Sequence, residues 1–177
     1  MPRRADAARN AEALLATARA VFAEQGSDAS LDDIAKRAGV GNATLYRHFP
    51  TRADLLAAVY AEEVSALCAE ATNSLNAASP ADALFTWLDH FVTHVATKRP
   101  LALAITESRQ PELFARWHRS LHDAAALLLT RAHLAGSVAD DLTVTDLLAL
   151  TSATAMATTD PAHARRLLHT LRHGIER

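Results

Sequence analysis

The 177-residue sequence has few of the residues that build disulfides, sheets and irregular loops. It contains one cysteine, five glycines and six prolines, and aromatic residues make up only 5% of it. The single cysteine, Cys68, excludes a disulfide within the chain. Strands are enriched in β-branched and aromatic residues, whereas the alanine and leucine that abound here favour helices. The composition therefore predicts an all-α fold.

Segments with recognisable targeting or catalytic roles are also missing. The N-terminus lacks the apolar stretch of a signal peptide, and no run approaches the length that spans a membrane. We therefore expect a cytoplasmic protein with no membrane partner. No nucleophile elbow, phosphate-binding loop or His-Glu-x-x-His pattern occurs. We therefore expect that the protein is not an enzyme, and that it has no catalytic residues, no cofactor and no bound metal.

Glycine and proline fall mainly between segments of helical periodicity, and four predicted helix starts share one pattern. A hydroxyl residue is followed three positions later by aspartate, which suits an N-cap hydrogen bond and the positive helix end. These pairs are Ser30/Asp33, Thr51/Asp54, Ser79/Asp82 and Thr143/Asp146. The pattern predicts about nine helices, at residues 8–25, 31–38, 42–49, 52–76, 80–97, 101–108, 112–135, 144–158 and 162–174.

The segment 31–49 has the spacing of a helix-turn-helix. Ile34 and the small Ala35 suit the inner face of a short helix, and Gly39 permits the left-handed backbone that ends it. Val40 and Leu45 can then anchor the following helix. This order of small residue, turn glycine and apolar anchor is what a helix-turn-helix requires.

Polar side chains surround the anchor Leu45 on the second of these helices. Asparagine can pair with adenine, arginine with guanine, and an alanine or threonine methyl can meet the thymine methyl in a major groove. Hydroxyl and imidazole groups can also bind phosphates, and Arg52 lies beside a positive helix end. The residues concerned are Asn42, Ala43, Thr44, Tyr46, Arg47, His48 and Arg52. The alternative is an ordinary polar surface on a small helical bundle.

Charge is unevenly distributed in a chain of formal net charge −2. Residues 1–52 carry eight Arg or Lys and six Asp or Glu, whereas residues 53–177 carry ten and fourteen. The asymmetry favours a polyanion partner at the N-terminal end alone.

The stretch Thr44-Leu-Tyr-Arg-His-Phe-Pro-Thr-Arg-Ala-Asp-Leu-Leu56 resembles the TetR family of bacterial repressors. The resemblance, which spans Ser30 to Leu56, implies a DNA-binding domain at residues 1–51. It further implies a helical effector-binding and dimerisation domain at 52–177. By motif position, Asn42, Ala43, Tyr46 and Arg47 correspond to base readers, and Thr44, His48 and Arg52 to phosphate contacts. Gly41 departs from the family's usual serine at that N-cap, which removes one hydroxyl.

The resemblance also implies how such a protein acts. We expect a homodimer that pairs its last two helices in a four-helix bundle and binds a palindromic double-stranded DNA operator as a repressor. A small-molecule effector would shift the equilibrium between two spacings of the reading helices. The large side chains of residues 80–135 can line its cavity, and the candidates are Trp87, Phe91, His94, Trp117 and Leu121. The alternative is that these residues are simply core.

Two histidine pairs with helical spacing suggest a different reading. His90 and His94 lie four residues apart, and His118 and His122 repeat the spacing, so the pairs could ligate zinc if their helices met. A metal-responsive regulator or a metal-dependent hydrolase is therefore the alternative function. No cysteine or tight carboxylate cluster completes such a site, which favours solvated or hydrogen-bonded histidines.

Overall fold

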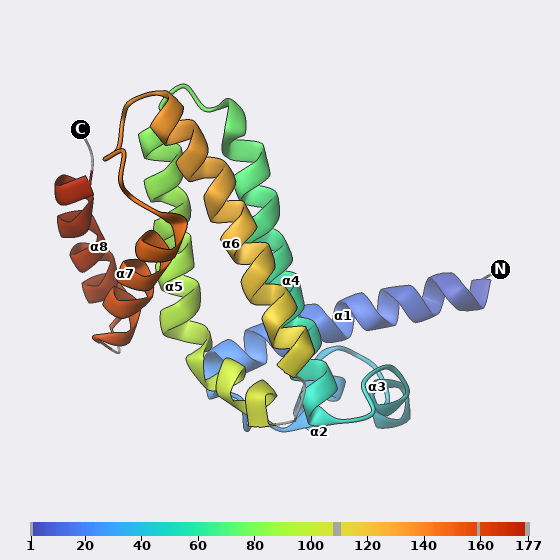
Figure 1. The fold of residues 1–177 in the computed structure, drawn as a ribbon. Helices are drawn as coiled ribbons and strands as arrows, with labels where there is room; N and C mark the ends of the chain where they lie inside the picture. Colours follow the sequence, from blue (N-terminus) through green and yellow to red (C-terminus); the bar gives the residue numbers. More distant parts are fainter. Residues whose placement is uncertain (1, 108–110, 159, 176–177) are drawn as a thin grey trace. The chain divides into compact units, whose positions relative to one another are not determined.

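The computed structural model describes residues 2–107, 111–158 and 160–175, which form helices joined by turns (Figure 1). The elements are α1 (Pro2–Gln25), α2 (Leu31–Arg37), α3 (Asn42–His48), α4 (Arg52–Asn73), the 3-10 turn η1 (Ser74–Asn76), α5 (Pro80–Glu107), α6 (Pro111–Leu134), α7 (Val144–Met156) and α8 (Pro161–Ile175). No β-strand occurs among the described residues, which confirms the all-α prediction.

The described residues form eight α-helices where the sequence predicts about nine. The difference lies in α5, which continues through Pro100 although a break was predicted between residues 97 and 101. An internal proline removes one helical hydrogen bond, and the leucines and alanines that follow are strong helix formers. Other prolines begin helices, because proline suits the first helical position: α5, α6 and α8 start at Pro80, Pro111 and Pro161.

All four predicted N-caps are present. Ser30 Oγ accepts a hydrogen bond from the Asp33 amide at 3.4 Å, and Ser79 Oγ accepts one from Asp82 at 3.2 Å. The Thr51 and Thr143 hydroxyls each accept from the aspartate amide three residues later, at 3.1 Å. Each cap satisfies an amide that lacks a partner within its own helix, and so fixes where the helix starts.

The chain divides into two compact units. One comprises Met1–Glu62 with Pro100–Gln110, and the other comprises Glu63–Arg99 with Pro111–Arg177. Both α4 and α5 contribute residues to each unit. The sequence division between residues 51 and 52 falls at the start of α4, and as a domain boundary it stays a prediction.

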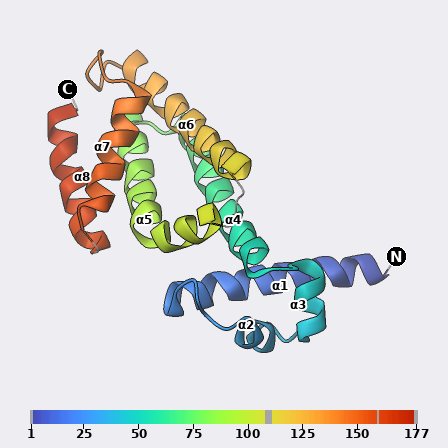
Figure 2. The same cartoon turned by 60° about the horizontal axis from the view of Figure 1, so that its bottom comes forward.

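In the first unit, α1, α2 and α3 pack against one another around a small core (Figure 2). The apolar stripe of α1 supplies Leu14, Ala18 and Val21, and the short helices supply Ile34 and Leu45; all five are almost completely buried. Burying this stripe is what stabilises two helices that are too short to persist alone.

In the second unit, the completely buried side chains include Trp87 of α5 and leucines from α5, α6 and α7. α6 packs against α7, and α7 packs against α8, with the last two helices antiparallel in both views (Figures 1 and 2). None of the described helices is both long and apolar enough to cross a membrane.

Candidate DNA-binding surface and effector site

The turn between α2 and α3 is closed by backbone hydrogen bonds around Gly39. Its φ of 71° places it in the left-handed region, and its amide donates to the Lys36 carbonyl at 3.2 Å. The Val40 amide donates to the Ala35 carbonyl at 3.0 Å. These two bonds form a Schellman motif, which ends α2 and redirects the chain. The predicted roles of Gly39 and the buried Ala35 are therefore confirmed.

α3 separates one buried side from one exposed side. Leu45 is 1% exposed and anchors the helix, whereas Tyr46 is 47% exposed. All four predicted base readers, Asn42, Ala43, Tyr46 and Arg47, are exposed, and Thr44 and His48 are half-buried at the margins. The helix begins after Gly41, which makes no side-chain cap. The arrangement leaves a seven-residue helix with the side chains of one side exposed to solvent.

One reader already has a partner that the sequence did not indicate. Asn42 Nδ2 donates a 2.8 Å hydrogen bond to Asp32 Oδ1, on the first turn of α2. The bond fixes the amide of Asn42 at the start of α3. An adenine contact uses one N–H of this amide and its Oδ1, so the second N–H of Nδ2 remains for it while the bond to Asp32 holds.

Arg52 and His48 are held inside the unit more than their predicted phosphate roles suggest. Arg52 Nη1 donates to the carbonyls of Ser27, at 2.9 Å, and Ala29, at 2.6 Å. It therefore ties the turn between α1 and α2 to the start of α4. His48 Nε2 is buried without a hydrogen-bond partner, so a phosphate contact from this ring falls to Nδ1.

Arg37, on α2, forms ion pairs with two carboxylates. Arg37 pairs with Glu24 of α1 at 3.0 Å and with Asp33 at 2.9 Å. The hydrogen bond to Glu24 and the charge of Asp33 raise the pKa of Arg37. Its charge is thus compensated within the unit, whereas Arg47 has no acidic partner among the described residues.

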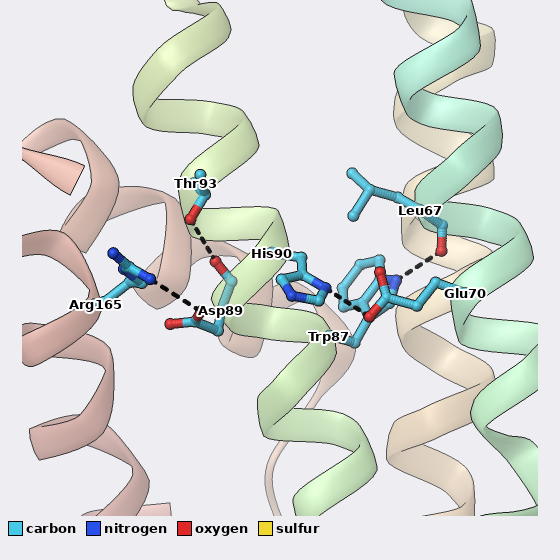
Figure 3. Close-up of polar contacts among 7 residues, drawn as sticks. All are labelled: Leu67, Glu70, Trp87, Asp89, His90, Thr93 and Arg165. Carbon is cyan, nitrogen blue, oxygen red and sulfur yellow. Dashed lines mark hydrogen bonds and ion pairs between the residues drawn. The ribbon is translucent and has the colours of Figure 1, made fainter. Parts of the chain in front are cut away.

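The predicted effector residues are all buried in the second unit. Trp87 Nε1 donates to the Leu67 carbonyl at 2.8 Å (Figure 3). The Trp87 ring also stacks on Phe91, with centroids 5.4 Å apart. His94 lies 3.4 Å from Glu63. Trp117 and Leu121, on α6, are also buried. Their part in binding an effector stays a prediction, because buried aromatic side chains suit a core and a closed cavity equally.

The histidine pairs bind local partners. His90 Nδ1 lies 2.6 Å from Glu70 Oε1 (Figure 3), and His118 Nδ1 lies 3.0 Å from the Phe114 carbonyl. His122 lies 3.7 Å from Asp123. Among the described residues, no group of three or more histidine, cysteine or acidic side chains is placed to hold a metal ion.

Comparison with known proteins decides the family. The protein-family model described as "Bacterial regulatory proteins, tetR family" matches residues 14–59, which include the whole helix-turn-helix. A second, "Transcriptional regulator SbtR-like, C-terminal domain", matches residues 79–177, more than half of the chain. The chain belongs to the TetR family. It is therefore a DNA-binding transcription regulator and not an enzyme, so the hydrolase alternative is set aside.

Solved TetR-family structures agree along nearly the whole length. A TetR transcriptional regulator from Streptomyces coelicolor is 33% identical with a TM-score of 0.79, covering 94% of this chain and 98% of its own. A TetR regulator from Mycobacterium vanbaalenii is 31% identical with a TM-score of 0.79, covering 99% of this chain and all of its own. The repressor of a Stenotrophomonas maltophilia multidrug efflux pump shares the fold at 20% identity and a TM-score of 0.64, covering 94% of this chain and 90% of its own. None of the curated proteins matches the sequence.

Proposed function

We propose that this TetR-family protein is a dimeric repressor that holds a palindromic operator through two copies of α3 and releases it when a small molecule binds. The observation that carries the proposal is the exposed side of α3, where Asn42, Ala43, Tyr46 and Arg47 surround the buried anchor Leu45. Such a helix can enter a major groove without disturbing the core that supports it.

Each exposed group has a distinct task in this proposal. The guanidinium of Arg47, which no carboxylate engages among the described residues, pairs with guanine, while Asn42 contacts adenine through Oδ1 and the N–H that Asp32 does not bind. Tyr46 and the methyl of Ala43 contact neighbouring base edges. Thr44, His48 and the remaining donors of Arg52 bind phosphates and set the register of the helix in the groove.

The proposed dimer surface lies on α7 and α8. Opposite the buried side of α7 lies an exposed side that is apolar after Asp146 in its first turn, and a second copy of the chain is the partner expected of a TetR regulator. Its members are Ala149, Leu150, Ala153, Met156 and Ala157. On α8, Leu167 and Gly174 lie along one flank together with His163 and Thr170. Packing of the α7 side and this flank around a twofold axis would form a four-helix bundle.

The dimer sets the distance between the reading helices. One α3 offers too few base contacts, whereas two copies about 34 Å apart reach successive turns of one face of DNA. Effector binding in the second unit then favours another spacing, to the extent that the ligand prefers that state. Because operator binding requires access to DNA, we place the protein in the bacterial cytoplasm.

Selection from a random duplex pool tests the proposal. We expect a palindromic site whose affinity falls steeply with salt, as phosphate neutralisation requires. Arg47→Ala should weaken binding by about 1–3 kcal/mol and relax specificity at one position in each half-site. Arg119→Ala, on the exposed surface of α6, is the matched control and should leave affinity unchanged. Failure to enrich any site, or equal losses in both variants, would refute the proposal.

The dimer surface has its own test. Leu150→Asp places a charge in the middle of the apolar side of α7, where the side chain is 43% exposed and makes little core contact. The variant should sediment as a folded monomer and lose operator affinity. A variant that remains dimeric would show that the two copies meet elsewhere.

A further inference from the structure

A cavity of about 530 Å³ lies between α5 and α8, within the second unit. Its size falls in the range of small-molecule sites. α5 supplies Phe85, Thr86 and Asp89, and α8 supplies Arg165, Arg166, His169 and Arg172 together with apolar residues. It contains none of the five predicted effector residues. It also lies on the flank of α8 away from Leu167 and Gly174.

Positive charge dominates the lining. Arg165 is 4.0 Å from Asp89 across the cavity (Figure 3), and Arg172 is 2.5 Å from Asp82, a neighbour on α5 outside the lining. Arg166 has no acidic partner within the described residues. The two carboxylates therefore offset two of the three guanidinium groups, and one positive charge remains uncompensated.

The inner wall is apolar and holds one cation in place. Phe85 and Leu168 are both buried, and the guanidinium of Arg172 lies 5.0 Å from the Phe85 ring centroid. Stacking on Phe85 and pairing with Asp82 restrict this arginine. A ligand that meets it therefore loses less side-chain entropy than one that must order a free arginine.

We propose that this cavity binds a small organic monoanion, with its carboxylate at Arg166 and a flat apolar body against Ala162 and the edges of Phe85 and Leu168 that reach the cavity. One uncompensated charge matches one carboxylate, and the bidentate geometry of a guanidinium suits that group. The apolar wall excludes inorganic phosphate as an equal ligand, because phosphate leaves that wall without a contact. If the anion is also the effector, that role rests on the proposed function, whereas binding to the cavity does not.

Calorimetric titration of the full chain without DNA tests the site. The ligands are 1-naphthoate, the neutral isostere 1-naphthamide and inorganic phosphate. We expect naphthoate to bind about tenfold or more tightly than naphthamide or phosphate, the size of one charge-assisted contact. Arg166→Gln should weaken naphthoate binding about tenfold, and Arg119→Gln, the same change on α6, should not alter it.

Three results would overturn the assignment: no binding of naphthoate at millimolar concentration, equal binding of naphthamide, or equal losses in Arg166→Gln and Arg119→Gln. Arg166 is exposed, so its replacement should leave the helical circular dichroism unchanged. Operator affinity measured on the same variant separates this site from the proposed function. Arg166→Gln should bind DNA as the wild type does, and loss of naphthoate binding alone would support the cavity.

Discussion

α3 and α8 both present basic side chains, but to different kinds of space. Arg47 of α3 lies on an exposed helix side, whereas the arginines of α8 line a cavity together with Phe85. A long polyanion such as DNA suits the first arrangement, because each contact can be made without enclosing the ligand. A small anion suits the second, because the apolar residues of the lining add contact to charge. The comparison teaches that the support behind an arginine, as much as its charge, selects the ligand.

The largest expected effect comes from truncating Phe85, the buried aromatic residue of the cavity. Phe85 is buried and carries the Arg172 guanidinium, so Phe85→Ala should lower the free energy of unfolding by about 3–5 kcal/mol. Tyr46→Ala, on the exposed side of α3, should change it by less than about 0.5 kcal/mol. Urea unfolding of both variants measures the contrast. Similar losses would mean that the two regions are built alike.

In the turn before α3, replacing Gly39 should lower the stability of the protein, whereas replacing Gly41 should not. Gly39 has a φ of 71°, so Gly39→Ala should cost about 1–2 kcal/mol of unfolding free energy through backbone strain alone. No atom lies within 4 Å of the added Cβ at Gly39 or at Gly41, so neither change creates a clash. Gly41 has a φ of −75°, and Gly41→Ala should be close to neutral. Thermal unfolding distinguishes the two; an equal cost at both would exclude the strain explanation.

Removing a carboxylate beside α3 should sharpen its preference for a polyanion. Asp32 accepts a hydrogen bond from the Asn42 amide and adds a negative charge near the exposed side of α3. Asp32→Ala frees the amide, and we expect operator affinity to rise by about 0.5–1 kcal/mol, the worth of an exposed charged contact. Gel-shift titration at two salt concentrations measures it. A fall in affinity would instead show that Asp32 positions Asn42 for DNA.

The smallest expected effect is the pH dependence of stability that comes from the ion pair between Asp82 of α5 and Arg172 of α8. The hydrogen bond from Arg172, then that from Ser79, lowers the pKa of Asp82 below its ordinary value near 3.8. A carboxyl with a lower pKa in the folded state stabilises the fold above its unfolded pKa and loses this effect as pH falls through the folded one. The difference in stability between wild type and Asp82→Asn should therefore shrink from pH 7 to pH 3. A difference that persists at pH 3 would assign the effect to something other than ionisation.

What the sequence predicted was mainly local. The exposed side of α3, the turn at Gly39 and the four caps depend on neighbours within a few positions, where helical spacing decides direction. Arg52 contacts carbonyls 25 and 23 residues away, and Arg172 pairs with Asp82 across 90 residues. Periodicity carries no information about which distant faces meet. The break predicted at Pro100 was wrong because a proline lowers helix stability without forbidding the helix.

The four hydroxyl caps bear on the order in which the protein folds. Each bond joins residues only three apart, so it can form in a chain whose distant parts have not yet met. Closing so short a loop costs little entropy, and the caps reduce the nucleation cost of α2, α4, α5 and α7. These helices therefore have defined starting points before they find their neighbours. The remaining step is the packing of helices that have already begun to form. Folds rich in local contacts reach the native state quickly.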